Sequence, residues 1–484
     1  MGITRGKLYK CLILIIGLAT ISGCGRFASQ KEYGEGKYES VQSFEDVARY
    51  TGKMRDVFSY VYTTRKELAL TFNGMGDMET ISELLDALDR HHEIKATFFL
   101  PGIRVAEEPK IAKMILARGH EIESNTLNQL DLSDMSYEQV YKEIQLSNEV
   151  IERETGVSPR YLRTKSGDYT NDIRLIAAQL GMDAVIHYSI NPKDRDMKDA
   201  KSIGDYVKRY ITRGAIISLN TDINPEVVAS IEYISKAAEE INYTFVPLHE
   251  LIANGSERKP LNEIAGFDAI KIDMNYHQKV PNLFHKATTD EKVIALTFDD
   301  WASDKTVTEI LAILAEYEVK STFFLIGKGV EKNPNLARAI FEEGHEVASH
   351  SYSHQVVMTM TPQEMQEDLV KSHEVLTEAI QQQPTLLFRP ATGAIDEETA
   401  KIVAAVGYPA VGLYDLTSFD WNVSNQAEDI VQRVMSRKKP GSVIVLHILD
   451  ETHTIEALPL LIEGLKREGY SFLKMSELME LETN

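Results

Sequence analysis

Two histidines and one aspartate in the C-terminal half have the residue types and spacing to hold a catalytic metal ion. Asp300 ends the apolar run "VIALTFDD", and His350 and His354 stand four residues apart in "SHSYSH". Two imidazoles and one carboxylate suit a catalytic zinc whose fourth position is left for water. The histidine spacing alone is a weak indication, because surface histidines are common. If the segment is helical, the spacing places both imidazoles on one face of a single turn.

Further reactive side chains follow other apolar runs of the same half. Asp299 precedes Asp300, while Arg389 and His447 end the runs "LLFR" and "SVIVLH". These runs alternate with amphipathic helical patterns, which predicts parallel strands joined by helical crossovers. The reactive residues then share the carboxyl ends of the strands, where a β/α barrel builds its active site.

The apolar runs and helical patterns give the expected elements of this half. The expected strands are "VIALTFDD", "VKSTFFLIG", "HEVASHS", "LLFRP" and "SVIVLH". The expected helices are "TVTEILAILAEY", "NLARAIFEEG", "PQEMQEDLVKSHEVLTEAI" and "EETAKIVAAVG".

The N-terminal half repeats this pattern at a nearly constant offset. "ALTFNG" matches "ALTFDD", "KATFFLPG" matches "KSTFFLIG", "ARGHEIES" matches "EEGHEVAS", "LRTKSG" matches "FRPATG", and "GAIISLN" matches "GSVIVLH". Matching positions are 225 to 227 residues apart, as between Gly119 and Gly344 or Asn220 and His447. Five blocks in one order indicate a duplicated domain of about 200 residues.

The N-terminal copy has lost the reactive side chains. Asp299, Asp300, His350, His354 and His447 correspond to Asn73, Gly74, Asn125, Gln129 and Asn220. Amides are poor zinc ligands, and Asn cannot act as a general base at neutral pH. We therefore expect this copy to keep the fold without the reaction. It could bind the same kind of ligand as the other copy, orient that copy or act as a spacer.

One histidine is shared by the two copies. Gly119-His120-Glu121 matches Gly344-His345-Glu346. Because the copy without the reactive residues keeps His120, we interpret His345 as structural.

The C-terminal motifs resemble those of the polysaccharide deacetylase family, the NodB-like carbohydrate esterases. "TFDD", "HSYSH", "FRPATG", "FDW" and "VLH" occur in the family order over residues 291–484, and residues 55–255 share the framework only. The resemblance implies a fold of two tandem distorted (β/α) barrels. It also implies removal of acetyl groups from N-acetylated sugars with Zn²⁺ or another divalent transition metal.

The resemblance also implies a role for each motif residue. Asp299 is similar to the general base that activates water, and Asp300, His350 and His354 to the metal ligands. Arg389 would orient the base, and His447 would be the general acid paired with Asp420. The backbone N–H of Thr392 would stabilise the oxyanion, and Trp421 and Leu446 would line the acetyl pocket.

Three positions depart from the family pattern. Trp301-Ala302 replaces the usual Gly-Pro, Thr392 stands where Tyr is common, and Thr417 where Asp is common. These changes affect the expected glycan more than the expected chemistry. Trp301 could stack on a sugar face or serve as a core or lid aromatic.

The N-terminus has the features of a bacterial lipoprotein signal. Basic residues precede the apolar run "CLILIIGLATISG", which is too short to span a bilayer, and the segment ends in "ISGC". Residues 1–24 are interpreted as the signal, with Cys24 as the lipidation site. Residues 25–45 read as a tether, 46–252 as the degenerate domain, 253–290 as a linker and 291–484 as the catalytic domain. Two acyl chains suffice for stable membrane attachment.

The amino-acid composition and net charge restrict the classes of molecule that the protein can bind. The 484 residues are 43% hydrophobic and 26% charged, which is typical of a globular protein. A formal net charge of −21 argues against a nucleic-acid partner.

The leading expectation is an extracytoplasmic, membrane-anchored N-deacetylase acting on peptidoglycan. Chitin-type oligomers and an N-acetylglucosamine exopolysaccharide are alternative substrates. An O-acetyl polysaccharide esterase and a non-catalytic glycan-binding lipoprotein are the alternative functions.

Overall fold

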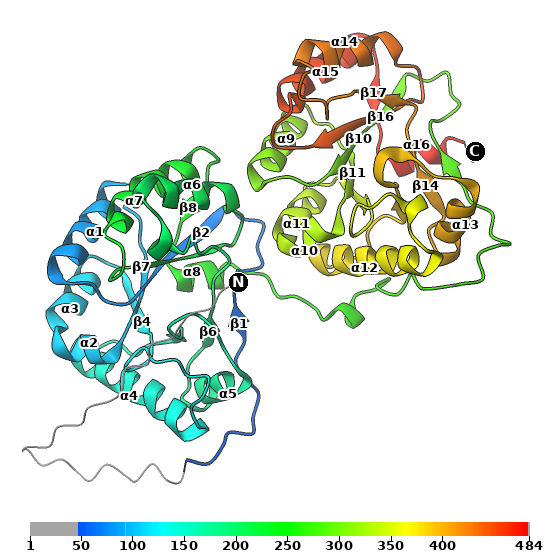
Figure 1. The fold of residues 1–484 in the computed structure, drawn as a ribbon. Helices are drawn as coiled ribbons and strands as arrows, with labels where there is room; N and C mark the ends of the chain where they lie inside the picture. Colours follow the sequence, from blue (N-terminus) through cyan, green and yellow to red (C-terminus); the bar gives the residue numbers. More distant parts are fainter. Residues whose placement is uncertain (1–46, 92, 483–484) are drawn as a thin grey trace, which may run out of the picture. The chain divides into compact units, whose positions relative to one another are not determined.

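Two curled sheets of parallel strands, each flanked by helices, carry the two repeats (Figure 1). The computed structural model describes residues 47–91 and 93–482. The predicted signal with Cys24 and the tether over residues 25–45 lie outside the described residues. No helix in the described part of the chain is long and apolar enough to cross a membrane.

The first sheet has strand order β1-β6-β5-β4-β3-β2-β7, with β8 paired to β2. Its strands are β1 (Val57–Phe58), β2 (Glu67–Asn73), β3 (Thr97–Leu100), β4 (Glu121–Ser124), β5 (Tyr161–Leu162), β6 (Ala184–Ile186), β7 (Ile216–Asn220) and β8 (Thr244–Phe245). The helices are α1 (Met78–Arg90), α2 (Gly102–Glu107), α3 (Pro109–Ala117), α4 (Tyr137–Thr155), α5 (Asn171–Gln179), α6 (Ala200–Tyr210), α7 (Glu226–Glu239) and α8 (Leu248–Ala253), with the 3₁₀ turn η2 (Asp194–Asp196).

The second sheet has the related order β15-β16-β10-β11-β12-β13-β14-β9, with β17 paired to β10. Its strands are β9 (Leu283–Phe284), β10 (Val293–Asp300), β11 (Thr322–Leu325), β12 (Glu346–Ser349), β13 (Leu387–Phe388), β14 (Ala410–Gly412), β15 (Leu416–Thr417), β16 (Val443–Ile448) and β17 (Ser471–Phe472). The helices are α9 (Asp304–Glu316), α10 (Gly327–Lys332), α11 (Pro334–Glu342), α12 (Pro362–Ile380), α13 (Glu397–Val406), α14 (Ala427–Arg437), α15 (Thr454–Arg467) and α16 (Met475–Glu480), with 3₁₀ turns η3 (Leu261–Glu263), η4 (Val357–Thr359) and η5 (Ala391–Gly393).

Strand β10 shows why these apolar runs become central strands. Its first seven residues are buried, as expected for a parallel strand covered on both faces. Phe298 packs with helix residues such as Leu311 and Leu458 in one hydrophobic cluster. The equivalent Phe72 packs in the same way in the first sheet. The prediction of two tandem distorted (β/α) barrels is therefore confirmed.

The same capping device begins the longest helix of each barrel. Ser136 and Gln139 form a capping box at the start of α4, and Thr361 and Glu364 form one at the start of α12. In such a box, each side chain satisfies a backbone N–H that the helix itself leaves free. The two helices span 19 residues each, so the duplication extends to helix length.

The segment predicted as linker contributes to the second sheet. Helix α8 ends at Ala253, and β9 pairs in parallel with β14 through Leu283 and Phe284. The second sheet therefore takes its first strand from within residues 253–290.

Candidate active site

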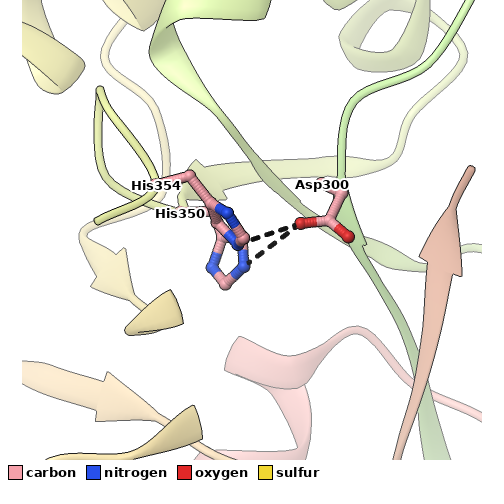
Figure 2. Close-up of side chains that lie close together, drawn as sticks. All are labelled: Asp300, His350 and His354. Atoms are coloured by element: carbon pink, nitrogen blue, oxygen red, sulfur yellow. Dashed lines mark ion pairs between the residues drawn. The ribbon is translucent and has the colours of Figure 1, made fainter. Parts of the chain in front are cut away.

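Asp300, His350 and His354 converge at the carboxyl end of β10 and β12. Their ligand atoms all lie within 4.8 Å of one another, the one group of this kind among the described residues. Oδ1 of Asp300 lies 3.2 Å from Nε2 of His354 and 3.6 Å from Nε2 of His350, and both rings point at it in Figure 2. This buried oxygen has no hydrogen-bond partner in the described part of the chain. The donor set and the unpaired oxygen fit a divalent cation such as zinc.

A backbone carbonyl fixes the ring of His350. Nδ1 of His350 donates to the carbonyl oxygen of Arg389 at 2.8 Å. Because a carbonyl only accepts, the proton sits on Nδ1 and the lone pair of Nε2 faces Asp300. This second contact is the usual way in which proteins orient a metal-binding imidazole.

The segment carrying the two histidines is a bend and not a helical turn. Ser351 and His354 adopt left-handed φ angles of 66° and 59°. The helical condition assumed for the histidine spacing is therefore not met, although the two imidazoles still meet. The carboxylate of Asp368, on α12, accepts the backbone N–H groups of Tyr352 and Ser353 at 2.6 and 3.0 Å. Asp368 was not predicted, because a polar residue on a helix gives no sequence signal for such a contact.

Asp300 itself has a strained backbone. Its φ of 83° is rare for a residue with a Cβ, and strain of this kind gathers at functional sites. Burial acts to raise the pKa of Asp300, but the neighbouring imidazoles, His354 foremost, hold it below its usual value. Asp300 is thus kept in the ionised form that a metal ligand needs.

Arg389 fixes Asp299 beside the proposed ligands. Nη1 of Arg389 donates to Oδ1 of Asp299 at 2.7 Å and to Oγ1 of Thr297 at 2.8 Å. Its other nitrogens donate to the carbonyls of Gly412 and Leu413. Both charged side chains are buried, so the pair is rigid and its geometry is well defined.

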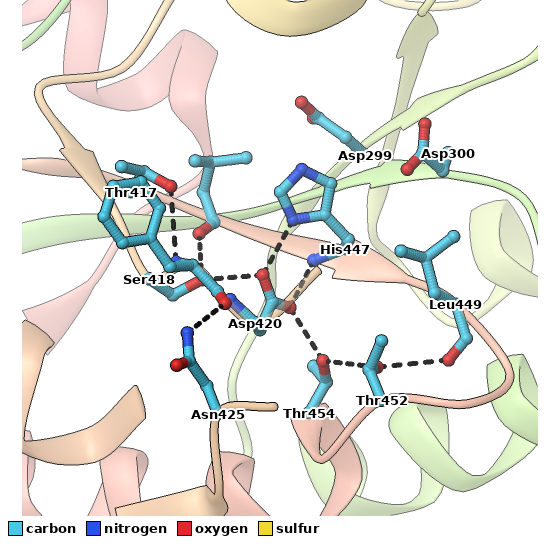
Figure 3. A network of polar contacts seen from close by, with 12 residues as sticks. Asp299, Asp300, Thr417, Ser418, Asp420, Asn425, His447, Leu449, Thr452 and Thr454 are labelled. Carbon is cyan, nitrogen blue, oxygen red and sulfur yellow. Dashed lines mark hydrogen bonds and ion pairs between the residues drawn. The ribbon is translucent and has the colours of Figure 1, made fainter. Parts of the chain in front are cut away.

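His447 is held by Asp420, as Figure 3 shows. Nδ1 of His447 lies 2.7 Å from Oδ1 of Asp420, and the backbone N–H of His447 donates to Oδ2 at 2.7 Å. Burial acts to lower the pKa of His447, but the bond to Asp420 and its charge raise it above the usual value. A protonated imidazole with a raised pKa is suited to proton donation.

Two hydroxyl groups that the sequence analysis did not identify complete the setting of Asp420. Ser418 Oγ donates to Oδ1, and Thr454 Oγ1 donates to Oδ2, each at 2.7 Å. Asp420 is fully buried, so these donors stabilise its negative charge. Ser418 lies two residues before Asp420, so its position next to the motif could have identified it. Thr454 lies on α15, and the motif gives no signal for it.

The residues predicted to bind substrate are less uniformly placed. Thr392 is exposed in η5 with a left-handed φ of 65°. Trp421 is 52% exposed beside Phe419, with ring centroids 6.0 Å apart. Trp301 is partly buried and packs against Gly329, where a Cβ would lie 2.3 Å from its ring. Trp301 is therefore built into the β10–α9 connection.

Leu446 does not lie on the site face, and this corrects its predicted pocket role. It is fully buried in the same hydrophobic cluster as Phe298, its partner across the β10–β16 ladder. Side chains alternate along a strand, so His447 and Val445 point to the opposite face. Val445 pairs with Thr297, whose hydroxyl contacts Arg389, and is therefore the residue of this motif nearer the site.

The first barrel copies the hydrogen bonds of the site without its ligands. Asn125 donates to the carbonyl of Arg163 at 2.7 Å, as His350 does to that of Arg389. Asn220 donates twice to the buried Asp194, at 2.7 and 3.0 Å, as His447 contacts Asp420. Asp194 escaped the sequence analysis, although the 226-residue offset from Asp420 could have identified it.

Two further features set the first barrel apart. A Cβ on Gly74, which replaces Asp300, would lie 2.7 Å from the carboxylate of Asp222, so Asp222 fills that space. Arg163 is fully buried, but its partner is the neutral Asn73 at 3.3 Å. Burial without a carboxylate lowers the pKa of Arg163 to about 9.

The shared histidines have the same surroundings in both barrels. Nδ1 of His120 accepts the N–H of Ala96, and Nδ1 of His345 accepts that of Ser321, each at 3.1 Å. Both rings are buried against a phenylalanine edge. Their contacts support the structural interpretation of His345.

Comparison with known proteins agrees with the geometry. The family described as polysaccharide deacetylase matches residues 60–185 and 286–411. A peptidoglycan-N-acetylglucosamine deacetylase from Bacillus cereus is 31% identical over 193 residues, which are 39% of this chain and 89% of the relative. A peptidoglycan-N-acetylmuramic acid deacetylase from Bacillus subtilis is 30% identical over 40% of this chain and 74% of its own length.

Solved structures that resemble this chain include a protein from Bacillus anthracis described as a CE4 family pseudoenzyme. It is 28% identical, covers 42% of this chain and 70% of its own, and superposes with a TM-score of 0.40. The two matched segments, the relative from Bacillus cereus and the convergent side chains of the second barrel lead to one conclusion. The chain belongs to the polysaccharide deacetylase family of hydrolases and carries the family domain twice.

Proposed function

We propose that the second barrel hydrolyses the acetamido groups of an N-acetylated cell-surface polysaccharide, with peptidoglycan as the substrate. Water adds to the acetyl carbonyl carbon, the C–N bond breaks, and acetate and a free amine are the products. The observation that carries the proposal is the convergence of Asp300, His350 and His354 beside two fixed reactive groups, Asp299 and His447.

The metal-binding role falls to Asp300, His350 and His354. A bound zinc or another divalent transition metal would supply Lewis acidity for the acetyl carbonyl and for the attacking water. The free Oδ1 of Asp300 and the Nε2 atoms of both histidines face one point, so three ligand positions are available there.

Two residues would move protons. Asp299 would accept the proton of the attacking water, because the bond from Arg389 holds its carboxylate in one orientation. His447 would protonate the leaving amine from Nε2, since Nδ1 is held by Asp420. An amide nitrogen is a poor leaving group unless protonated, so a charged imidazole favours amide over ester cleavage. Thr392 would contribute its backbone N–H to the oxyanion.

The names of the relatives support peptidoglycan as the substrate. The proteins from Bacillus cereus and Bacillus subtilis are named as peptidoglycan deacetylases. The two names differ in the sugar, N-acetylglucosamine in one and N-acetylmuramic acid in the other. We propose N-acetylglucosamine, and the test below distinguishes the two.

The test is mass spectrometry of muropeptides after incubation of purified cell wall with the full chain and Zn²⁺. A loss of 42 mass units on N-acetylglucosamine, absent with Asp299→Asn, is the expected result. Chitooligosaccharides and acetylated xylan are run in parallel. Turnover confined to acetylated xylan would favour an O-acetyl esterase, and binding without turnover on every substrate would favour a glycan-binding lipoprotein.

We also propose that the protein acts outside the cytoplasm, anchored to the membrane through Cys24. The support is the signal-like sequence of residues 1–24 and the polar tether of residues 25–45. Labelling cells with a radioactive fatty acid tests this proposal. Incorporation into the wild-type chain and its loss in Cys24→Ala is the expected result, and unchanged labelling would contradict it.

A further inference from the structure

A buried ion pair joins the two barrels close to the active site. Nη1 of Arg213, just before β7, lies 2.7 Å from Oδ1 of Asp304, the first residue of α9. The exposed fractions of the two side chains are 3% and 0%. Asp304 also accepts the hydroxyl groups of Tyr243 and Thr212, at 2.5 and 3.0 Å. Three donors from the first barrel therefore satisfy one carboxylate of the second.

A buried amide makes a second contact between the same surfaces. Asn335, at the start of α11, donates to the carbonyls of Val61 and Arg213 at 2.8 and 2.7 Å and accepts the N–H of Thr63. It is 1% exposed. Buried polar groups are costly unless paired, so Asp304 and Asn335 both need the first barrel against them. Residues 47–484, which include both barrels, form one compact unit.

The residues of this contact are not shared between the repeats. At the repeat offset, Asp304 corresponds to Met78, which is 41% exposed, and Arg213 corresponds to Pro440. Asn335 corresponds to Lys110. One barrel carries the cation and the other the carboxylate, so the contact is heterologous and neither copy could form it with itself.

The first turn of α9 links this contact to the reactive residues. Asp304 follows Asp300 by four residues, and Trp301 lies in the connection between them. Oγ of Ser303 and Oγ1 of Thr306 donate to Asp450, which lies three residues after His447. The same turn therefore bonds to the first barrel on one side and to the His447 loop on the other.

We propose that the first barrel is a brace for the active site of the second, with Arg213 as a positioning residue. Arg213 holds Asp304 in place and thereby fixes the first turn of α9. Through this turn it also fixes the connection that carries Trp301 and the carboxyl ends of β10 and β16. Only the expected effect on catalysis rests on the proposed function. The mechanical consequence, a rigid first turn of α9, can be measured without any substrate.

The experiment compares Arg213→Ala in the full chain with Arg209→Ala, an exposed arginine on α6 that serves as the matched control. Hydrogen exchange of residues 299–306 is measured first. We expect faster exchange there in Arg213→Ala and no change in Arg209→Ala, because only the former leaves Asp304 without its cation. Unchanged exchange in Arg213→Ala overturns the brace, whatever the activity of the enzyme.

Steady-state kinetics on N-acetylated oligosaccharide then tests the catalytic consequence. We expect kcat of Arg213→Ala to fall about tenfold to a hundredfold, as for small misplacements of reactive groups, with KM and bound zinc nearly unchanged. Arg213→Lys should recover part of kcat, since it keeps the charge. Faster exchange with an unchanged kcat would overturn the positioning role. A wild-type chain without turnover would reject the proposed function and leave the exchange result to decide the brace.

Tyr243→Phe provides a second variant if Arg213→Ala fails to fold. It removes the 2.5 Å hydroxyl bond to Asp304 and keeps the cation. A smaller rise in the exchange rate over residues 299–306 is expected than in Arg213→Ala. The absence of any rise would count against the brace.

Discussion

Asp420 holds His447 through two separate bonds, one to the imidazole Nδ1 and one to the backbone N–H, each 2.7 Å long. The first bond sets the charge of the ring, and the second sets its position on β16. The first barrel keeps both bonds, between Asp194 and Asn220, although the amide of Asn220 cannot act as an acid. The carboxylate therefore serves the architecture of this strand end in both barrels, and under the proposed function it has a further role in proton transfer in the second.

Asp420→Asn should shift the pH dependence of turnover. The carboxylate raises the pKa of His447, so its loss lowers that pKa and deprotonates the general acid at a lower pH. We expect the alkaline limb of kcat to move to lower pH. A kcat–pH profile on an N-acetylated oligosaccharide measures this shift. A profile that keeps its alkaline limb would contradict the assignment of His447 as the acid.

Asp299 and Asp300 should separate catalysis from metal binding, although they are adjacent. Asp300→Asn removes the charged ligand, and we expect the purified chain to lose its zinc. Asp299→Asn leaves all three proposed ligands in place, so zinc should remain while kcat falls by at least about 10²-fold. Metal analysis of both variants beside Asn125→Ala, a change in the first barrel, checks this. Zinc lost from Asn125→Ala would show that metal binds elsewhere.

Sequence patterns predicted the strand ends and the repeat because both follow from local rules. Apolar runs on parallel strands place Asp299, Asp300 and His447 at one edge of the sheet, and the structure has them there. The left-handed bend at Ser351 could not be predicted, because it depends on Asp368 of a separate helix. Leu446 was assigned to the wrong face because the motif was matched by residue type and not by strand alternation.

Contacts between the repeats were also beyond the sequence analysis. Arg213 and Asp304 are 91 residues apart and belong to different copies, so no periodicity relates them. Asp222, which follows β7, fills the space next to Gly74, the counterpart of Asp300. A sequence pattern gives no signal for this contact. Such contacts depend on tertiary packing, whereas the sequence pattern reports each element separately.

Asn73→Asp should stabilise the first barrel. Arg163 is buried against neutral acceptors, whereas its counterpart Arg389 has the carboxylate of Asp299. A carboxylate at residue 73 would pair the buried guanidinium with a negative charge, so that donor and acceptor are both ionised. Such bonds contribute about 1.5–3 kcal/mol, equivalent to a rise in Tm of roughly 3–12 °C for a domain of this size.

Differential scanning calorimetry of the full chain measures the change. Asn220→Asp is the matched control of opposite sign, because it would place a second carboxylate against Asp194. We expect its Tm to fall. A lower Tm for Asn73→Asp as well would show that the first barrel does not tolerate a charge at this position.

The buried histidines should make the fold sensitive to acid. Burial lowers the pKa of His120 to about 4 and that of His345 to about 3, against a usual value of 6.5. Between these values and 6.5 the unfolded chain binds protons that the folded chain does not. The free energy of unfolding therefore falls as pH is lowered from 6.5 towards 4, and the contribution is complete only above 6.5. Urea denaturation at several pH values measures the slope of the free energy of unfolding against pH.

His345→Asn keeps a side-chain acceptor for the N–H of Ser321 but cannot be protonated, so it should flatten the slope. An unchanged slope in this variant would assign the acid sensitivity to other groups.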